Sequence, residues 1–159
     1  MSQPALIDFA VHHFSVSVPD LDEAIAWYSK VFGFVEEVRF EVAAIPARAA
    51  FLRSPALRLE LWQAAGSAPV PEARRSPNTD LQTCGTKHIA FAVPDLQGCL
   101  RKMVNLGVDI AAVQRTPAEP MQPDLDPAGP GKPPVFAAFI RDPAGTLIEI
   151  LDRSRLGSE

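Results

Sequence analysis

One nine-residue pattern occurs twice in this chain, and this repeat constrains the fold more than any other feature. The pattern is H-x-x-x-x-V-P-D-L, which begins at His13 and again at His88. Each copy is followed by apolar residues at helical spacing that end at a glycine, Gly33 or Gly107. A repeat that agrees in length and order as well as in letters predicts two structural modules of the same design.

Each copy of the pattern predicts a β-strand followed directly by an α-helix. Large apolar residues alternate with small or polar residues, which is the period of a strand with two different faces. Asp20, with Glu23 three residues later, and Asp95 in the second copy stand where helix N-caps are expected. The small-residue face of each strand begins with a histidine, His13 or His88.

Further strand-like segments follow each helix, so each copy is expected to fold as β-α-β-β-β, an α+β class. These segments cover residues 34–42, 48–53 and 56–62 in the first copy and residues 108–114, 134–141 and 145–151 in the second. We expect one domain over residues 1–159, made of a first module (8–65), a linker (66–86) and a second module (87–153). The second module contains a Pro-rich loop (115–134), whose length is typical of a lid, an interface arm or a mobile surface loop.

The last strand of each module carries a glutamate between large aliphatic residues. If the aliphatic residues face the helix, Glu60 and Glu149 face the other side of the sheet, where His13 and His88 also lie. A buried carboxylate without a partner is costly, and two imidazoles with two carboxylates suit a divalent transition metal. We therefore predict that these four side chains bind one divalent ion (Ni, Co, Mn, Zn or Fe).

Small and polar residues on the same faces are expected to line a substrate pocket. The expected pocket residues are Ser15, Ser17, Arg58, Trp62, Ala90 and Ala92. Arg58 and Trp62 share the alternation of Glu60 and are suited to hold an anion or a ring of the substrate. Glu41 is a weaker candidate for an additional base. His12 is expected to point away from His13, and it is therefore left out of the site.

Composition excludes several other classes of function. The net charge is −4 and there is no basic stripe, which argues against a nucleic-acid partner. The apolar runs are no longer than strands, so no membrane span is predicted, and the N-terminus lacks the pattern of a secretory signal. Cys84 and Cys99 form no disulfide or metal-binding pattern. The expected location is cytoplasmic.

The chain resembles the vicinal oxygen chelate superfamily, which includes glyoxalase I, methylmalonyl-CoA epimerase, extradiol dioxygenases, fosfomycin-resistance transferases and bleomycin-binding proteins. The resemblance covers about residues 8–153 and rests on "HHFSVSVPDLDEAIAWYSKVFGF", "KHIAFAVPDL" and "RDPAGTLIEI". It implies tandem βαβββ modules that form a half-open mixed β-barrel around a metal ion. It also implies a small-molecule substrate that chelates the metal through vicinal oxygens. Modules in this superfamily pair within one chain or between two chains, and we expect a homodimer.

The ligand set indicates which activity the resemblance implies. His13, Glu60, His88 and Glu149 match the four-ligand set of glyoxalase I-like enzymes, which implies a lyase or isomerase. In such an enzyme the metal is a Lewis acid and Glu149 or Glu60 transfers a proton. In glyoxalase I-like enzymes an arginine just after the first ligand helps to hold the glutathione carboxylate. The stretch after His13 has no arginine, which argues against a glutathione thioester as the substrate. Two alternatives stay open: an extradiol-type ring-cleaving dioxygenase that uses only His13, His88 and Glu149, and a non-catalytic module that binds a small molecule such as a drug.

Overall fold

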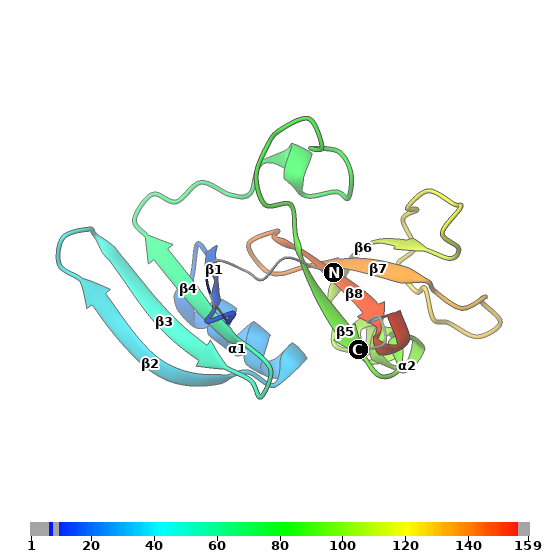
Figure 1. The fold of residues 1–159 in the computed structure, drawn as a ribbon, viewed down its shortest axis with the longest axis horizontal. Coiled ribbons are helices and arrows are strands. Elements are labelled where there is room, and N and C mark those ends of the chain that lie inside the picture. The colour runs from blue at the N-terminus through cyan, green and yellow to red at the C-terminus, as the bar shows by residue number, and fades with distance from the viewer. Residues whose placement is uncertain (1–6, 8–9, 156–159) are drawn as a thin grey trace.

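The computed structural model describes residue 7 and residues 10–155, and it contains two βαβββ modules in sequence (Figure 1). The first module consists of β1 (Phe14–Ser17), α1 (Leu21–Phe32), β2 (Val35–Val42), β3 (Ala47–Arg53) and β4 (Arg58–Ala64). The second module consists of β5 (Ile89–Val93), α2 (Leu96–Asn105), β6 (Asp109–Gln114), β7 (Ala137–Arg141) and β8 (Leu147–Asp152). Two short 3-10 helices, η1 (Glu72–Arg74) and η2 (Arg153–Arg155), lie in the linker and after β8.

The two modules have the same sheet topology. The strand order is β1-β4-β3-β2 in the first sheet and β5-β8-β7-β6 in the second. In each sheet the first strand runs parallel to the last one, and the other pairs are antiparallel. β1 and β5 are edge strands, so neither sheet closes on itself. The expected α+β fold, with tandem βαβββ modules in a half-open arrangement, is confirmed.

Both helices begin at the expected N-caps. Asp20 and Asp95 each accept a hydrogen bond of 2.9 Å from the amide N–H three residues further on. Gly33 ends α1 with φ 72°, in the left-handed region that glycine adopts without strain. α2 ends one residue earlier than expected, because Leu106 is its C-cap and Gly107 follows with φ 73°. Within the described residues, neither helix has the length and apolar character needed to cross a membrane.

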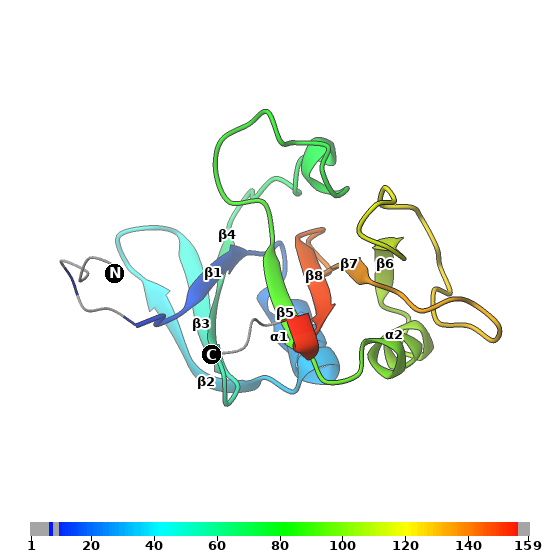
Figure 2. The same cartoon turned by 45° about the vertical axis from the view of Figure 1, so that its right-hand side comes forward.

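One hydrophobic core serves both modules. α1 lies on the side of the first sheet that faces the second module (Figures 1 and 2). The ring of Phe91 in β5 lies 4.9 Å from the ring of Phe32 in α1 and 6.3 Å from that of Phe14 in β1. The buried Tyr28 hydroxyl donates a hydrogen bond of 3.0 Å to Asp142 Oδ2 in the β7–β8 turn. The modules are therefore packed together through α1 as well as joined by the linker.

Three strands begin two or three residues later than the sequence pattern indicates, because turns and prolines precede them. Before β4, the Ser54 amide donates to the carbonyl of Leu57 at 2.8 Å and closes a turn. Before β8, Asp142 Oδ1 accepts from the Thr146 amide at 2.8 Å. β7 begins at Ala137, after a pair of prolines that have no amide hydrogen for the ladder.

The Pro-rich loop 115–134 is anchored by an ionic cluster centred on Asp124. The two carboxylate oxygens of Asp124 accept hydrogen bonds from Arg115 Nη2 at 2.8 Å and from Lys132 Nζ at 2.6 Å. Gln122 forms an antiparallel bridge with Val113 at the end of β6. These contacts hold the loop against its own module, so its shape is set by specific contacts.

Candidate metal centre

The first half-site is formed by His13, Glu60 and Phe51. His13 Nε2 lies 3.4 Å from Glu60 Oε2. Glu60 is directed away from the helix because its neighbours Leu59 and Leu61 are fully buried on the other face of β4. Phe51 is the cross-strand partner of Glu60 in β3, and its ring meets the His13 ring edge-on at 5.3 Å.

The second half-site is formed by His88, Glu149 and Phe139 in the same arrangement. His88 Nε2 lies 3.2 Å from Glu149 Oε2. Phe139 is the cross-strand partner of Glu149, and its ring meets the His88 ring edge-on at 5.0 Å. Each module therefore places an imidazole between a carboxylate and a phenyl ring, and the sequence repeat is reproduced in the geometry of the side chains.

The spacing within each half-site fits a bidentate metal ligand. Two adjacent ligands that are each about 2.1 Å from one ion lie about 3.0 Å apart in octahedral geometry and about 3.4 Å apart in tetrahedral geometry. The nitrogen-to-oxygen distances of 3.4 and 3.2 Å fall in this range. The carboxylates are only 14% and 19% exposed, and such groups need a hydrogen-bond donor or a cation as partner. The donor set and spacing therefore fit a divalent ion.

The two half-sites do not merge into one cluster within the chain. Over residue 7 and residues 10–155, no group of three or more His, Cys, Asp or Glu side chains is close enough to hold a metal ion. The structure brings His13 to Glu60 and His88 to Glu149, but it does not bring all four predicted ligands together in one protomer. Each half-site offers two candidate ligands, so a four-ligand site would need a second half-site from another protomer.

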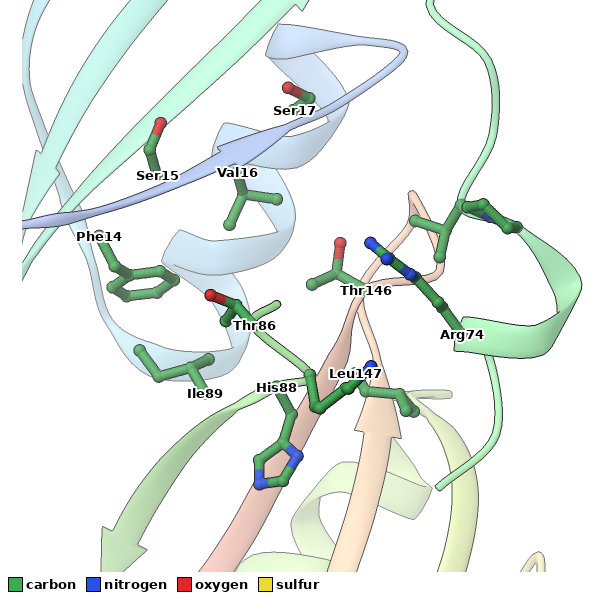
Figure 3. Close-up of a pocket in the computed structure, with 13 residues that line it drawn as sticks. Phe14, Ser15, Val16, Ser17, Arg74, Thr86, His88, Ile89, Thr146 and Leu147 are labelled. Atoms are coloured by element: carbon green, nitrogen blue, oxygen red, sulfur yellow. The ribbon is translucent and has the colours of Figure 1, made fainter. Parts of the chain in front are cut away.

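The expected pocket residues lie in three places, namely two clefts between the modules and the open face of the first sheet. Ser15 and Ser17 line a cleft of about 540 Å³ between β1 and the start of β5, which His88 also lines (Figure 3). Ala90 and Ala92 line a second cleft of about 490 Å³ along β5, together with residues of the first module. We refer to these as the first and second inter-module clefts.

Arg58 and Trp62 lie on the open face of the first sheet, as their alternation with Glu60 predicts. The ring of Phe40 is stacked 5.8 Å from that of Phe51 and meets the Trp62 ring edge-on at 5.8 Å. Arg58 Cζ lies 4.6 Å from the centre of the Phe51 ring. The surface beside Glu60 is therefore aromatic, with one guanidinium at its edge.

The positions of two further residues differ from what the pattern suggests. Glu41 alternates with Phe40 on β2 and so faces away from Glu60, towards a shallow groove at the β2–β3 turn. His12 does not point away from His13, because His12 Nδ1 lies 2.7 Å from His13 Nδ1. That expectation was wrong because β1 begins at Phe14, so strand alternation does not extend to the two histidines.

Segments from the Pro-rich loop and the linker lie beside the second half-site. Met121 of the Pro-rich loop packs on Ala111, Phe139 and Leu147 at the open face of the second sheet. Linker residues between Arg74 and Leu81 enclose a small pocket of about 60 Å³ with His88 and Phe139. Loop and linker therefore form walls beside the second half-site.

Sequence reasoning missed the two phenylalanines and the role of His12. Phe51 and Phe139 lie in equivalent strands, but they are recognisable as partners of Glu60 and Glu149 only when the strand register is known. The signal available in the sequence was that each module has a phenylalanine in the strand before the one that carries its glutamate.

Comparison with known proteins places this geometry in a family. The family model described as "Glyoxalase/Bleomycin resistance protein/Dioxygenase superfamily" matches residues 12–123. The fold is similar to trypanothione-dependent glyoxalase I of Leishmania major, with a TM-score of 0.63 and 22% identity over 92% of this chain and 88% of that one. It is also similar to a glyoxylase/bleomycin resistance protein/dioxygenase domain from Frankia sp. EAN1pec, with a TM-score of 0.63 and 20% identity over 92% and 100% of the two chains.

A third similar structure is lactoylglutathione lyase from Agrobacterium tumefaciens, with a TM-score of 0.56 and 19% identity over 94% of this chain and 97% of that one. At these identities the solved structures establish the fold alone. No curated protein matches the chain in sequence. The family match covers more than half of the sequence and includes both histidines and Glu60. The chain therefore belongs to the glyoxalase/bleomycin resistance protein/dioxygenase superfamily.

Proposed function

We propose that the chain is a metal-dependent lyase or isomerase of the glyoxalase or epimerase type, with active sites shared between two protomers. His13 and Glu60 of one protomer would hold a divalent ion together with His88 and Glu149 of the other. The observation that carries this proposal is the pair of separate half-sites, each with the spacing of a bidentate metal ligand. In a two-fold dimer, the two different half-sites would meet twice and form two equivalent sites.

The unpaired sheet edges support this assembly. β1 and β5 each have a neighbouring strand on one side only, and the two inter-module clefts run along them. Exposed sheet edges that are not blocked are ready to pair with another chain. We therefore propose a homodimer.

The proposed reaction is a proton transfer next to a carbonyl group. A divalent ion at the shared site would supply Lewis acidity to a small substrate that binds through two neighbouring oxygens. In the proposed reaction, Glu60 or Glu149 takes the proton from the substrate carbon and returns it. A positioned general base of this kind typically contributes about 10²- to 10⁴-fold to the rate. Phe51 and Phe139 pack edge-on against the two histidine rings and help to fix their orientation.

The surroundings of Glu60 favour an apolar group on the substrate. The rings of Phe40, Phe51 and Trp62 form the surface next to it. Arg58 already donates two hydrogen bonds to Glu37, of 2.9 and 2.6 Å, so its charge is largely satisfied. This half of the site is therefore better suited to an apolar or ring-bearing part of the substrate than to an additional anion.

Two other functions remain as alternatives to test. A ring-cleaving dioxygenase would bind Fe(II) through three ligands and leave Glu60 uncoordinated. The His13–Glu60 and His88–Glu149 pairs have similar geometry, which favours a site with four protein ligands over a site with three. A non-catalytic binding module would use the inter-module clefts and would need no metal.

Metal titration of the metal-free protein tests the proposal. Calorimetry with Ni²⁺, Co²⁺, Mn²⁺ and Zn²⁺ should give about one ion per chain, and Glu60→Gln and Glu149→Gln should each weaken binding by at least about tenfold. Glu41→Gln is the matched control, because Glu41 faces away from the site, and it should bind as the wild type does. Absence of binding for every ion would refute the proposal. Preferential Fe(II) binding with oxygen uptake on a catechol would favour the dioxygenase instead.

A further inference from the structure

Two hydrogen bonds and one ion-pair contact link Arg58 to Glu60 through the two adjacent histidines. Arg58 Nη1 lies 3.0 Å from His12 Nε2, and His12 Nδ1 lies 2.7 Å from His13 Nδ1. His13 Nε2 in turn lies 3.4 Å from Glu60 Oε2. Arg58 and Glu60 stand two residues apart on β4 and face the same side, so the chain begins and ends on one strand.

The guanidinium at the start of this chain is held from two sides. Glu37 Oε2 on β2 accepts from Arg58 Nε at 2.9 Å and from Nη2 at 2.6 Å. The Phe51 ring on β3 lies under the guanidinium, with Cζ 4.6 Å from its centre. These contacts leave Nη1 for His12, so the contact between Arg58 and His12 is supported by side chains of β2 and β3.

The chemistry of the groups determines which atom donates and which accepts at each step of the hydrogen-bond chain. A guanidinium can only donate, and a neutral imidazole has one donor nitrogen and one acceptor nitrogen. His12 Nε2 must therefore accept from Arg58, which places the proton of His12 on Nδ1. His12 Nδ1 then donates to His13 Nδ1, and the proton of His13 lies on Nε2, facing Glu60. With both imidazoles neutral, this direction satisfies every contact.

This direction conflicts with metal binding through His13 Nε2, because a ligating nitrogen needs a free lone pair. If the proton of His13 moved to Nδ1, it would face the N–H of His12. If His12 also reversed, its Nε2–H would face the N–H of Arg58. His13 Nε2 therefore becomes free only when either the Arg58–His12 contact or the His12–His13 contact opens.

The second half-site has no equivalent of this chain. The residue before His88 is Lys87, which donates to the carbonyls of Asp80 and Thr83. The residue two positions before Glu149 is Leu147, which has no polar side-chain atom. The hydrogen-bond chain therefore acts on one of the two histidines, and the two half-sites differ in how they are prepared for a metal ion.

We infer that the Arg58–His12–His13 chain is a latch that keeps His13 Nε2 protonated, and that metal binding at the first half-site requires one of its two contacts to open. This inference rests on the proposed function, in which His13 is a metal ligand. Arg58 and His12 are positioning residues here, because they act through His13. The latch weakens metal binding relative to a half-site without it.

The tautomer of His12 in the metal-free wild-type protein tests the direction of the chain without any metal. The protein has three histidines, so long-range ¹H–¹⁵N spectra at about pH 8.5, where imidazoles are neutral, are readily assigned. We expect His12 to carry its proton on Nδ1, the less common tautomer of a free side chain, and His13 to carry its proton on Nε2. A His12 proton on Nε2 would overturn the inference.

Two substitutions of Arg58 then test the effect on metal binding. Arg58→Gln supplies an amide that can accept as well as donate, so both directions of the chain are allowed, and Ni²⁺ should bind about tenfold more tightly. Arg58→Lys can only donate, so Ni²⁺ should bind within about twofold of the wild type. Equal affinities for the two variants would refute the latch. If none of the three proteins bound Ni²⁺, the proposed function would fail, and the tautomer measurement would still decide the direction of the chain.

Discussion

A shared active site predicts that two inactive variants restore a metal site when they are combined. One variant carries His13→Ala with Glu60→Ala, and the other carries His88→Ala with Glu149→Ala. Each homodimer then has two sites with only one half-site intact. In a heterodimer, one site combines the two altered half-sites, and the other combines the two intact ones. The two variants therefore complement each other only if half-sites from different protomers form one centre.

The symmetry of the dimer sets the size of the effect. Random exchange between equal amounts of the two variants gives about half heterodimers, and each heterodimer has one intact site out of two. High-affinity Co²⁺ binding should therefore recover to about one quarter of the wild-type capacity. The intense visible absorption of protein-bound Co²⁺ reports site number directly, and each variant alone is the control.

A metal centre formed within one protomer would give a different result. If His13, Glu60, His88 and Glu149 formed a centre within one chain, every protomer in the mixture would lack one half of it. Capacity would then stay at the level of the separate variants. Differently tagged protomers, captured on both tags in turn, show whether exchange took place, so that zero recovery in verified heterodimers excludes a shared site.

Three further predictions concern stability and the Pro-rich loop. Tyr28→Phe removes the buried hydrogen bond to Asp142 and should lower the free energy of unfolding by about 1–2 kcal/mol, measured by urea denaturation. Burial raises the pKa of the Asp142 carboxyl, so its contribution to stability is fully present below about pH 4 and is lost as the pH rises through the raised value. Asp142→Asn should therefore lower the free energy of unfolding by less at higher pH. A decrease that stayed constant or grew with pH, measured by urea denaturation, would contradict this expectation. Asp124→Ala removes the acceptor for Arg115 and should speed proteolytic cleavage within loop 115–134, whereas Asp126→Ala, as a neighbouring control, should not.

Much of the fold could be predicted because local and repeated signals agree. Asp20 and Asp95 cap the helices as the pattern indicates, and the alternation around Glu60 and Glu149 directs both carboxylates to the open faces. Strand boundaries were less accurate where turn chemistry decides. For example, β8 begins two residues later than the pattern indicates, because the Asp142–Thr146 hydrogen bond closes a turn before it.

The candidate site could be predicted as a set of residues but not as an arrangement in space. Strand parity shows that His13 and Glu60 share a face, and likewise His88 and Glu149, but it does not show how the two faces are oriented to each other. That orientation depends on the packing of α1 against the second module, which includes contacts such as Tyr28 with Asp142. The four-ligand set itself stays a prediction.

The common core has a consequence for the origin of the repeat. The buried side chains of α1 belong to the same core as those of α2, and Phe91 of the second module packs against Phe32 of the first. A single βαβββ unit would leave this apolar surface in water, and at about half the present length it would bury a smaller fraction of its surface on folding. An ancestor with one module would therefore have needed another copy of itself. The present chain joins two such modules through residues 66–86, so the surroundings of each half-site can differ while the common core is kept: aromatic rings lie beside the first, and loop and linker segments lie beside the second.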